Sequence, residues 1–320
     1  MQSTGDIILA FISGALLVFG VLWNLFNLAI TIHLQRKSRS YQTLEFIISC
    51  TTLSNLLLDL STICTVYFYE FKIFCTTEMG RVIPVVFFIL FSASASSFWS
   101  IAWLCVFYCV KIISLPTALF IKLKRNIALV VNWALILTVF FCFVLFCPFL
   151  SLIPIMPANA TANNTYNINN TLGMPCTSPR FDFPETFASE LYFVIFVLFL
   201  CPIPLIIMVT TSSQLVVHLC KHTQQMKRNQ NEFQSRNSYL LICKMIISLV
   251  VVYLFTIMLA FIYLLTQAKD EKMSNDFLVL DMAFYCAATG VLLTATNKNL
   301  KKKLASLFCC GKIQRQSEPK

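Results

Sequence analysis

Residues 82–110 read VIPVVFFILFSASASSFWSIAWLCVFYCV and contain no Asp, Glu, Lys or Arg. A helix that crosses the apolar core of a bilayer needs about 20 mostly apolar residues, so this stretch is long enough to span a membrane. It is too long for a strand of a membrane barrel, which runs for about 10 residues with alternating polarity. We therefore predict a transmembrane helix here.

Six further stretches have the same length and apolar character. They are Ile7–His33, Phe46–Tyr69, Ile127–Ile153, Leu191–Val217, Met245–Leu265 and Leu278–Thr296. Together the seven stretches predict an all-α membrane protein, a seven-transmembrane helix bundle. We expect a seven-helix domain of residues 1–296 and a basic cytoplasmic tail of residues 297–320 with a short amphipathic helix. The segment before the first stretch has no Lys or Arg, so we interpret that stretch as a retained span rather than a signal peptide.

The composition of the whole chain agrees with a membrane protein. Of its 320 residues, 58% are apolar and 12% are charged. Soluble domains carry about 25% charged residues. This balance excludes a disordered chain and a collagen-like fibre, and it disfavours a soluble enzyme. The net charge of +10 would suggest a nucleic-acid partner only if the basic residues did not border membrane spans.

The basic residues predict the orientation of the chain in the membrane. Most of the 24 Lys and Arg residues follow the first, third, fifth and seventh stretches. The exceptions are Lys72, Arg81, Arg180, Lys269 and Lys272. Because basic loops stay in the cytoplasm, we expect an extracellular N-terminus and a cytoplasmic C-terminus, in a multi-pass protein of the plasma membrane.

Acceptor sequences for N-linked glycans lie in the loop between the fourth and fifth stretches. They begin at Asn159, Asn163 and Asn169. Glycans are added on the side of the membrane that becomes extracellular, so these sequons agree with the orientation predicted from charge. Chance is the alternative, because an Asn-rich loop generates such triplets freely.

Cysteines in two places could be modified. Cys75 and Cys176 are the two cysteines in outer loops, where a disulfide is stable, and whether they pair stays open. Cys309 and Cys310 follow a Lys-rich stretch after the last span, which favours palmitoylation over two unmodified thiols. No pair has zinc-ligand spacing with a nearby His, so we expect no metal, and no motif indicates a cofactor.

The sequence lacks motifs for catalysis or transport. There is no nucleotide-binding glycine loop, no HExxH and no GxSxG, so we do not expect an enzyme. Asp59 is the one ionisable residue in the middle of a predicted span, and we expect it to hydrogen-bond inside the bundle, with Asn24 or Asn55 as candidate partners. A proton-coupled transporter usually needs more such groups and repeated halves. A seven-helix bundle with a basic cytoplasmic face is the architecture of a G-protein-coupled receptor.

Short motifs at five places along the chain point to one receptor family. The third stretch ends in WSIAWLCVFYCVKI at residues 99–112 and is followed by LFIKLKR at 119–125; GVLWNLF stands at 20–26, LCKHTQQM at 219–226, KMIIS at 244–248 and NKNLK at 297–301. These segments resemble the bitter taste receptor (type 2 taste receptor) family, whose third span ends in W-x-x-x-x-L-x-x-F-Y-x-x-K-I. Each piece alone is weak, but together and in order they cover nearly the whole chain.

Four positions depart from the family pattern. Asn55 stands where the family usually has an Arg in the second span, and Tyr239 where it has a His before the sixth. Thr289-Gly290 replaces a His-Ser or His-Pro pair in the seventh span, and Leu90 replaces a Trp in the third. These differences suggest a divergent member.

The resemblance implies that the ligand cavity lies in the outer half of the bundle. Candidate ligand-binding residues are Phe87, Leu90, Phe91, Ser94, Thr256, Tyr263, Asp281 and Tyr285. Apolar walls with a few polar groups suit small bitter organic molecules, but for any single Phe packing between helices is the better explanation. Asp281 and Tyr285 are one helical turn apart and share a face of the helix. If that face points into the bundle, Asp281 would pair with a cationic ligand. If it points outward, Asp281 would be solvated at the membrane edge or would pair with a loop Lys.

A second set of residues lies at the cytoplasmic edge and implies coupling to a G protein. These residues are Phe107, Tyr108, Lys111, Lys124, Lys221, His222 and Lys244. Contact with lipid headgroups is the alternative for the basic members. The expected partners are a small bitter agonist, membrane lipid and a heterotrimeric G protein of the gustducin or inhibitory type. The competing interpretations are a vomeronasal type 1-like chemoreceptor and a small-molecule transporter.

Overall fold

Seven long helices make up most of the part of the protein that the structure describes. The computed structural model describes residues 4–38, 42–71, 82–113, 118–151, 192, 195, 197–226, 233–268, 275–297, 300–301 and 304–305. The helices are α1 (Thr4–Ser38), α2 (Thr43–Glu70), α3 (Val82–Ile112), α4 (Ala118–Phe146), α6 (Pro202–Met226), α7 (Phe233–Ala268) and α8 (Asn275–Thr296), with a short 3₁₀ helix η3 (Cys147–Ser151) after α4.

Each long helix contains one apolar stretch that is long enough to cross a membrane. The predicted fold class, an all-α seven-transmembrane bundle, is therefore confirmed. Several helices extend beyond the apolar stretches. The clearest case is α7, which begins at Phe233, three turns before the predicted start at Met245. Polar residues continue a helix into the aqueous region, where an apolar window cannot detect them.

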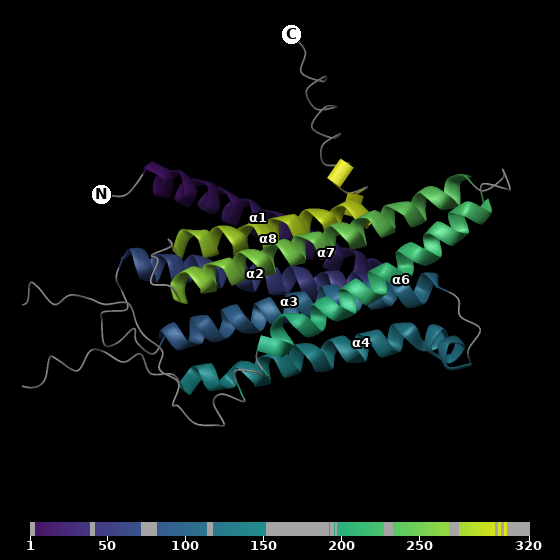
Figure 1. The fold of residues 1–320 in the computed structure, drawn as a ribbon, viewed down its shortest axis with the longest axis horizontal. Helices are drawn as coiled ribbons and strands as arrows, with labels where there is room; N and C mark the ends of the chain where they lie inside the picture. The colour runs from purple at the N-terminus through teal and green to yellow at the C-terminus, as the bar shows by residue number, and fades with distance from the viewer. Residues whose placement is uncertain are drawn as a thin grey trace, which may run out of the picture.

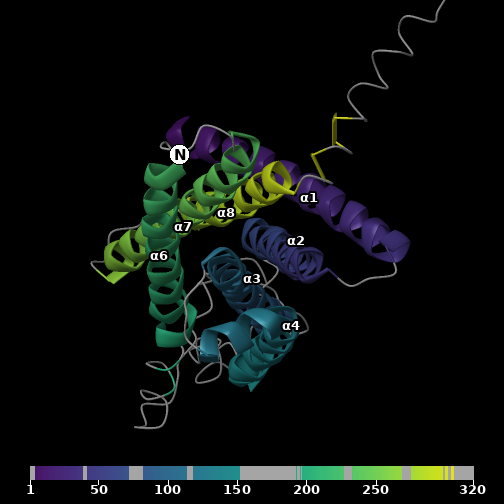
Figure 2. The same cartoon turned by 90° about the vertical axis from the view of Figure 1, so that its right-hand side faces the viewer.

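Neighbouring helices alternate in direction and pack around α3 (Figures 1 and 2). The third helix contacts α2, α4, α6 and α7, whereas α8 packs against α1, α2 and α7. The middle of α3 is buried along its whole circumference, and from Ser92 to Ser100 every residue is buried. Small Ser and Ala side chains in this segment let its neighbours approach closely.

Prolines set two helix boundaries. Pro148 has no N–H to continue the hydrogen-bonding pattern of α4, and the chain tightens into η3 at Cys147. The fifth predicted stretch is interrupted by a turn at Cys201, after which α6 begins with Pro202. Proline is favoured at the first position of a helix because that position needs no intrahelical donor.

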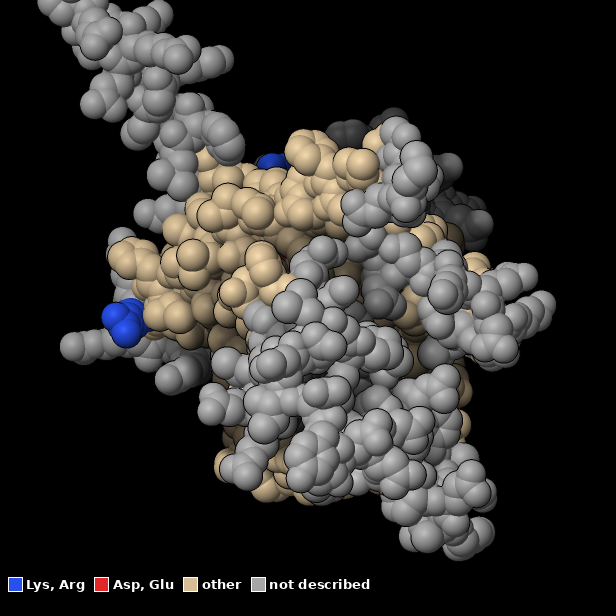
Figure 3. Space-filling view, turned by 90° about the vertical axis from the view of Figure 1, so that its left-hand side faces the viewer, with Lys and Arg blue, Asp and Glu red and all other residues tan. Residues whose placement is uncertain are grey.

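The two ends of the bundle differ in charge. Arg36, Lys111 and Lys221 lie toward the C-terminal ends of α1, α3 and α6, and Lys301 follows α8; these four helices run in the same direction. Lys244 lies in the first half of α7, which runs the other way. All therefore lie toward one end, as do the basic residues at the start of α4. The opposite end is viewed in Figure 3, where the part of the surface that the structure describes is mostly neither Lys, Arg, Asp nor Glu, with small patches of Lys or Arg at its margin. Residues 306–320 lie outside the described part, so the amphipathic tail helix stays a prediction.

Candidate ligand-binding and coupling sites

A network of hydrogen bonds joins four helices in the middle of the bundle. Ser97 on α3 donates to the Asn55 side-chain oxygen at 2.6 Å and lies 2.8 Å from the Tyr285 hydroxyl. The Asn55 amide donates to the Thr289 hydroxyl at 2.9 Å and to the Asn24 side-chain oxygen at 3.4 Å. All five side chains are buried. In these five side chains, the free-energy cost of a polar group in an apolar span is thus offset by a partner on another helix.

The network continues along the contact between α1 and α8. Asn27 donates to the Gly290 carbonyl at 2.9 Å and accepts from the Thr294 hydroxyl at 2.6 Å. The Trp23 indole donates to the same hydroxyl at 2.8 Å. A side chain at Gly290 would place its Cβ 3.0 Å from the Asn24 oxygen, so glycine is what permits this close approach.

Three aromatic rings form a layer that joins α3, α7 and α8. Phe98 packs edge-on against Tyr253, with ring centroids 4.8 Å apart, and edge-on against Tyr285 at 5.0 Å. Edge-to-face pairs at these distances add to the free energy gained from burial alone. The layer ties the sixth and seventh spans to the third.

Tyr253 also holds the irregular segment before α6. Pro204 has no N–H, so the carbonyl of Leu200 has no donor within its own helix. The Tyr253 hydroxyl lies 3.3 Å from that carbonyl and 2.9 Å from the carbonyl of Cys201. The Trp99 indole donates to the neighbouring Phe199 carbonyl at 3.2 Å. Two side chains from α7 and α3 thereby satisfy backbone groups beside the prolines.

Asp281 and Thr256 lie one turn beyond the aromatic layer, toward the outer end. Both are buried, each with 1% of its surface exposed. The Thr256 hydroxyl is near enough to interact with the Asp281 carboxyl, although neither group makes a hydrogen bond of good geometry within the described residues. Asp281 therefore faces into the bundle and is not at a solvated edge.

The four predicted ligand-binding residues on α3 do not share one environment. Leu90 packs against the main core, and the Ser94 hydroxyl donates to the Leu90 carbonyl at 2.8 Å. Phe91 instead stacks on Phe146 of α4, with centroids 6.1 Å apart, and on Phe87 at 6.3 Å. Leu90 and Ser94 are thus separated from a Phe cluster that packs toward α4. Tyr263 lies farther out on α7 and is half-buried.

Asp59 does not make the hydrogen bonds that we expected. Its carboxyl is 1% exposed, and neither oxygen has a hydrogen-bond partner among the described residues. Asn24 and Asn55 bond to each other and to α8 instead. The Cys286 thiol is close to the Asp59 carboxyl, and a Cβ at Gly20 would lie 3.0 Å from one carboxyl oxygen. The expected pairing with Asn24 or Asn55 is wrong.

The predicted coupling residues divide into buried and exposed groups. Phe107 and Tyr108 are buried at 5% and 6% exposure, with ring centroids 5.7 Å apart. The Lys111 ammonium lies 5.3 Å above the Phe107 ring, a cation–π geometry. Lys124 donates to the Ile113 carbonyl at 3.2 Å and so ties the start of α4 to the end of α3.

The remaining coupling residues lie farther along the same end. Lys221 and Lys244 are exposed. The His222 side chain is outside the described residues, and so are Asn159, Asn163, Asn169, Cys75, Cys176, Cys309 and Cys310. Glycosylation, the disulfide and palmitoylation stay predictions.

Reasoning from sequence missed the residues that connect the helices. Ser97, Phe98, Trp99 and Tyr253 were not among the candidates, although each lies in the central network or beside the α6 prolines. A usable signal was present for Ser97 because a polar residue in an apolar span needs a partner. No signal in one sequence marks Phe98 among 30 Phe residues.

Comparison with known proteins agrees with this architecture. The taste receptor protein (TAS2R) family matches residues 1–312. Taste receptor type 2 member 40 of Gallus gallus is 27% identical over 252 residues, which cover 77% of this chain and 73% of that protein. Taste receptor type 2 member 39 of Homo sapiens is 29% identical over 213 residues, 64% of this chain and 58% of that protein.

A third relative extends the similarity along more of the chain. Taste receptor type 2 member 1 of Pongo pygmaeus is 25% identical over 286 residues, 86% of this chain and 88% of that protein. The family is one of receptors rather than enzymes. The seven apolar helices of this chain, together with the family match, make it a multi-pass membrane protein. The chain belongs to the bitter taste receptor (TAS2R) family of G-protein-coupled receptors.

Proposed function

We propose that the protein binds a small bitter organic molecule in the outer half of the bundle and activates a heterotrimeric G protein of the gustducin or inhibitory type. The observation that carries the proposal is the buried Asp281 carboxyl, one turn beyond the layer of Tyr253, Phe98 and Tyr285. A carboxyl in an apolar span is costly and is usually retained for function.

The chemistry of this region favours ligands with an apolar body and a hydrogen-bond donor. Aromatic rings supply the contact area, and Asp281 and Thr256 supply two polar groups from adjacent helices. A basic amine or a hydroxyl of the ligand would complete the hydrogen bonding that the carboxyl lacks. Of the predicted ligand-binding residues on α3, Leu90 and Ser94 fit a site beside Asp281 and Thr256. The reason is that Leu90 packs against the core cluster that contains Tyr253 and Tyr285.

Activation requires that a bound agonist favour a different arrangement of the helices. A ligand shifts a conformational equilibrium only through unequal affinity for the two states. Tyr253, on α7, contacts the segment before α6 through two backbone carbonyls and α3 through Phe98, so a ligand above this layer would act on α7, on α3 and on the entry to α6. Tyr108 is buried at the opposite end. It would meet a G protein only after that end opens.

The orientation that fits this function has the N-terminus outside the cell and the C-terminus in the cytoplasm. The exposed Lys111, Lys221 and Lys244 would then face the G protein and the anionic inner leaflet. The opposite end, viewed in Figure 3, would face the extracellular side.

Calcium imaging of cells that co-express the receptor and a promiscuous G-protein α-subunit tests the function. Cells are screened with bitter compounds that do or do not carry a basic amine. We expect Asp281→Asn to lower the potency of amine agonists and to spare neutral ones. We expect Thr256→Val to lower potency, whereas Thr210→Val on the exposed face of α6 has no effect.

Two outcomes would contradict parts of the proposal. If Asp281→Asn lowers the potency of amine and neutral agonists equally, the carboxyl does not recognise the amine of the ligand. Uptake of a radiolabelled bitter compound into proteoliposomes, without any G-protein response, would favour a transporter instead.

A further inference from the structure

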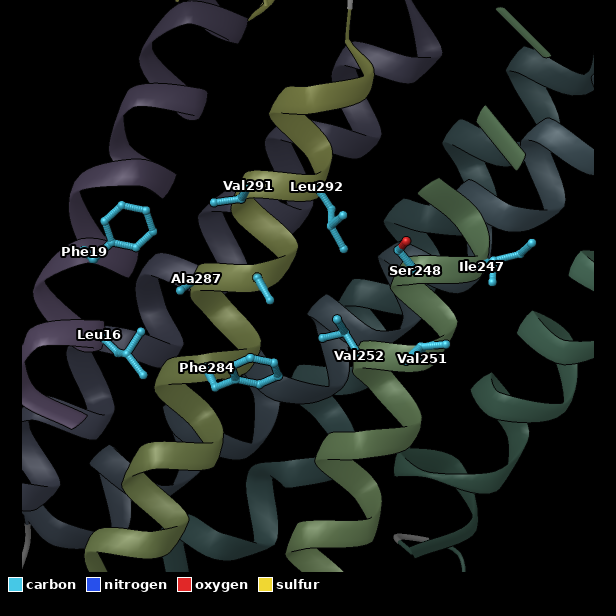
Figure 4. Close-up of a pocket in the computed structure, with 11 residues that line it drawn as sticks. Leu16, Phe19, Ile247, Ser248, Val251, Val252, Phe284, Ala287, Val291 and Leu292 are labelled. Carbon is cyan, nitrogen blue, oxygen red and sulfur yellow. The ribbon is translucent and has the colours of Figure 1, made fainter. Parts of the chain in front are cut away.

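An apolar groove lies on the outside of the bundle, away from the proposed ligand site. Its volume is about 530 Å³, and α1, α7 and α8 line it (Figure 4). Leu16 and Phe19 of α1 form one wall, and Val251 and its neighbours on α7 form the other. The base is α8, where Ala287 and Ala288 are too small to fill the space.

The groove opens sideways into the membrane. Its lining residues lie within the apolar spans Ile7–Arg36, Leu240–Tyr263 and Phe277–Ala295. Phe19 is 41% exposed and Val251 is 57% exposed, so the walls are accessible from the lipid side. An occupant therefore comes from the bilayer and not from water.

The shape of the groove favours a rigid occupant. From Phe284 to Leu292 the α8 base covers nine residues, or about 12 Å along the helix axis. Phe19 and Phe284 place aromatic rings on two of its sides. A flexible acyl chain loses conformational entropy when it settles into a fixed groove, whereas a fused ring system has none of that freedom to lose.

One end of the groove carries the polar group that a lipid with a single hydroxyl would need. Ser248 lines this end and donates to the Lys244 carbonyl at 2.9 Å, which leaves its oxygen able to accept a hydrogen bond. Lys244 is exposed one turn farther toward the basic end. Beyond Ser248, the lining is entirely apolar as far as Phe284.

We infer that this groove binds a membrane sterol, with its rings between α1 and α7 and its hydroxyl at Ser248. The volume is within the range of small-molecule sites. A sterol in this position would bridge two helices that both pack on α8. This site is separate from the proposed agonist site and does not depend on it.

Photolabelling of the full-length receptor in phosphatidylcholine nanodiscs tests the inference. The probe is a cholesterol analogue with a diazirine on its ring system, and adducts are mapped by mass spectrometry. We expect adducts concentrated on the lining residues of α1, α7 and α8, and several-fold weaker labelling when unlabelled cholesterol is added.

Variants that fill the groove provide the second part of the test. We expect Ala288→Phe to reduce labelling of the groove several-fold and Ala128→Phe, on the exposed face of α4, to leave it unchanged. Val251→Trp is the alternative variant if Ala288→Phe does not fold. It fills the same space, and because Val251 is already exposed, the larger side chain does not disturb the core. Ser248→Ala should weaken competition by cholesterol more than competition by a sterol that lacks the hydroxyl.

Three results would overturn the inference. One is labelling spread evenly over all lipid-facing residues, including Trp133 and Phe140 of α4. Another is the same adduct pattern from a phospholipid with a diazirine on its acyl chain. The third is a crosslink that joins two receptor copies at the groove, because a second copy would then be the occupant.

Discussion

The side-chain amide of Asn55 on α2 donates a hydrogen bond of 2.9 Å to the hydroxyl of Thr289 on α8. By the resemblance to the bitter receptor pattern, the two residues are expected to stand where that pattern has an Arg in the second span and a His in the seventh. The two departures are therefore in contact with each other. A neutral amide and a neutral hydroxyl satisfy one another without burying a charge, which explains how the core tolerates both changes.

Asn55→Ala is expected to destabilise the bundle. The substitution removes the hydrogen bonds to Ser97, Thr289 and Asn24. At about 0.6 kcal/mol for each bond in a membrane protein, the loss is about 2 kcal/mol. Thermal unfolding of the detergent-solubilised receptor measures it, with Asn126→Ala on the exposed start of α4 as the matched control. Equal melting temperatures for the two variants would mean that the network does not stabilise the fold.

Gly290→Ala should separate α1 from α8. The new Cβ would lie 3.0 Å from the Asn24 oxygen and 3.3 Å from Trp23. Overpacking of this kind costs about 1 to 3 kcal/mol. Gly14→Ala is the control because a Cβ there meets nothing within 4 Å. Surface expression and melting temperature should fall for Gly290→Ala alone, and a similar fall in both variants would argue against a specific contact.

Tyr253→Phe separates the two roles of this residue. The variant keeps the ring that packs on Phe98 but removes the hydroxyl that serves the carbonyls of Leu200 and Cys201. Leaving a buried carbonyl without a donor costs about 1 to 3 kcal/mol. We expect a lower melting temperature and an altered agonist response, whereas Tyr67→Phe at an exposed position of α2 changes neither. Wild-type behaviour of Tyr253→Phe would restrict Tyr253 to ring packing.

The fold could be predicted from the sequence because its main determinant is local. A run such as Val82–Val110 has no charge, and only a helix satisfies its backbone groups within the segment itself. The helix ends beyond the membrane were harder to predict. In α7 the helix begins three turns before Met245, and its first two turns are mostly polar, so no apolar pattern marks its start.

The site was predicted less completely because its geometry depends on contacts between distant segments. Phe87 and Phe91 share a face with Leu90 and Ser94 in sequence, yet Phe91 stacks on Phe146 of another helix. Asp59 has Asn55 one turn away, but the amide is already engaged by Thr289. One sequence shows which side chains need partners and does not show which partners are nearest.

The loop of residues 154–184 is expected to be extracellular and glycosylated. Its sequons at Asn159, Asn163 and Asn169 lie on the side with few Lys and Arg residues. Treatment with a peptide N-glycosidase should lower the apparent mass of the receptor on a gel. A triple Asn→Gln variant should already run at the lower mass. If the enzyme leaves the wild-type mass unchanged, the predicted orientation loses this support.

Lys111→Ala is expected to impair signalling more than agonist binding. The Lys111 ammonium lies over the Phe107 ring, and a cation–π contact at an exposed site contributes about 0.5 to 1 kcal/mol, too little to determine the fold. The side chain is exposed at the basic end, within reach of acidic or carbonyl groups of a docked G-protein α-subunit. Lys111→Arg keeps the charge and the ring contact, so it should retain most of the response.

Agonist-evoked calcium release at matched surface expression distinguishes docking from a general effect of charge. Lys72→Ala, at a position predicted from the sequence to lie on the opposite side of the membrane, is the control for loss of one positive charge. If Lys111 only anchored the helix to lipid headgroups, Lys122, Arg125 and their neighbours on the same side would compensate. An unchanged maximal response in Lys111→Ala would therefore leave membrane topology as the sole explanation of this charge, and a reduced response that Lys111→Arg restores would place the ammonium at the G-protein contact.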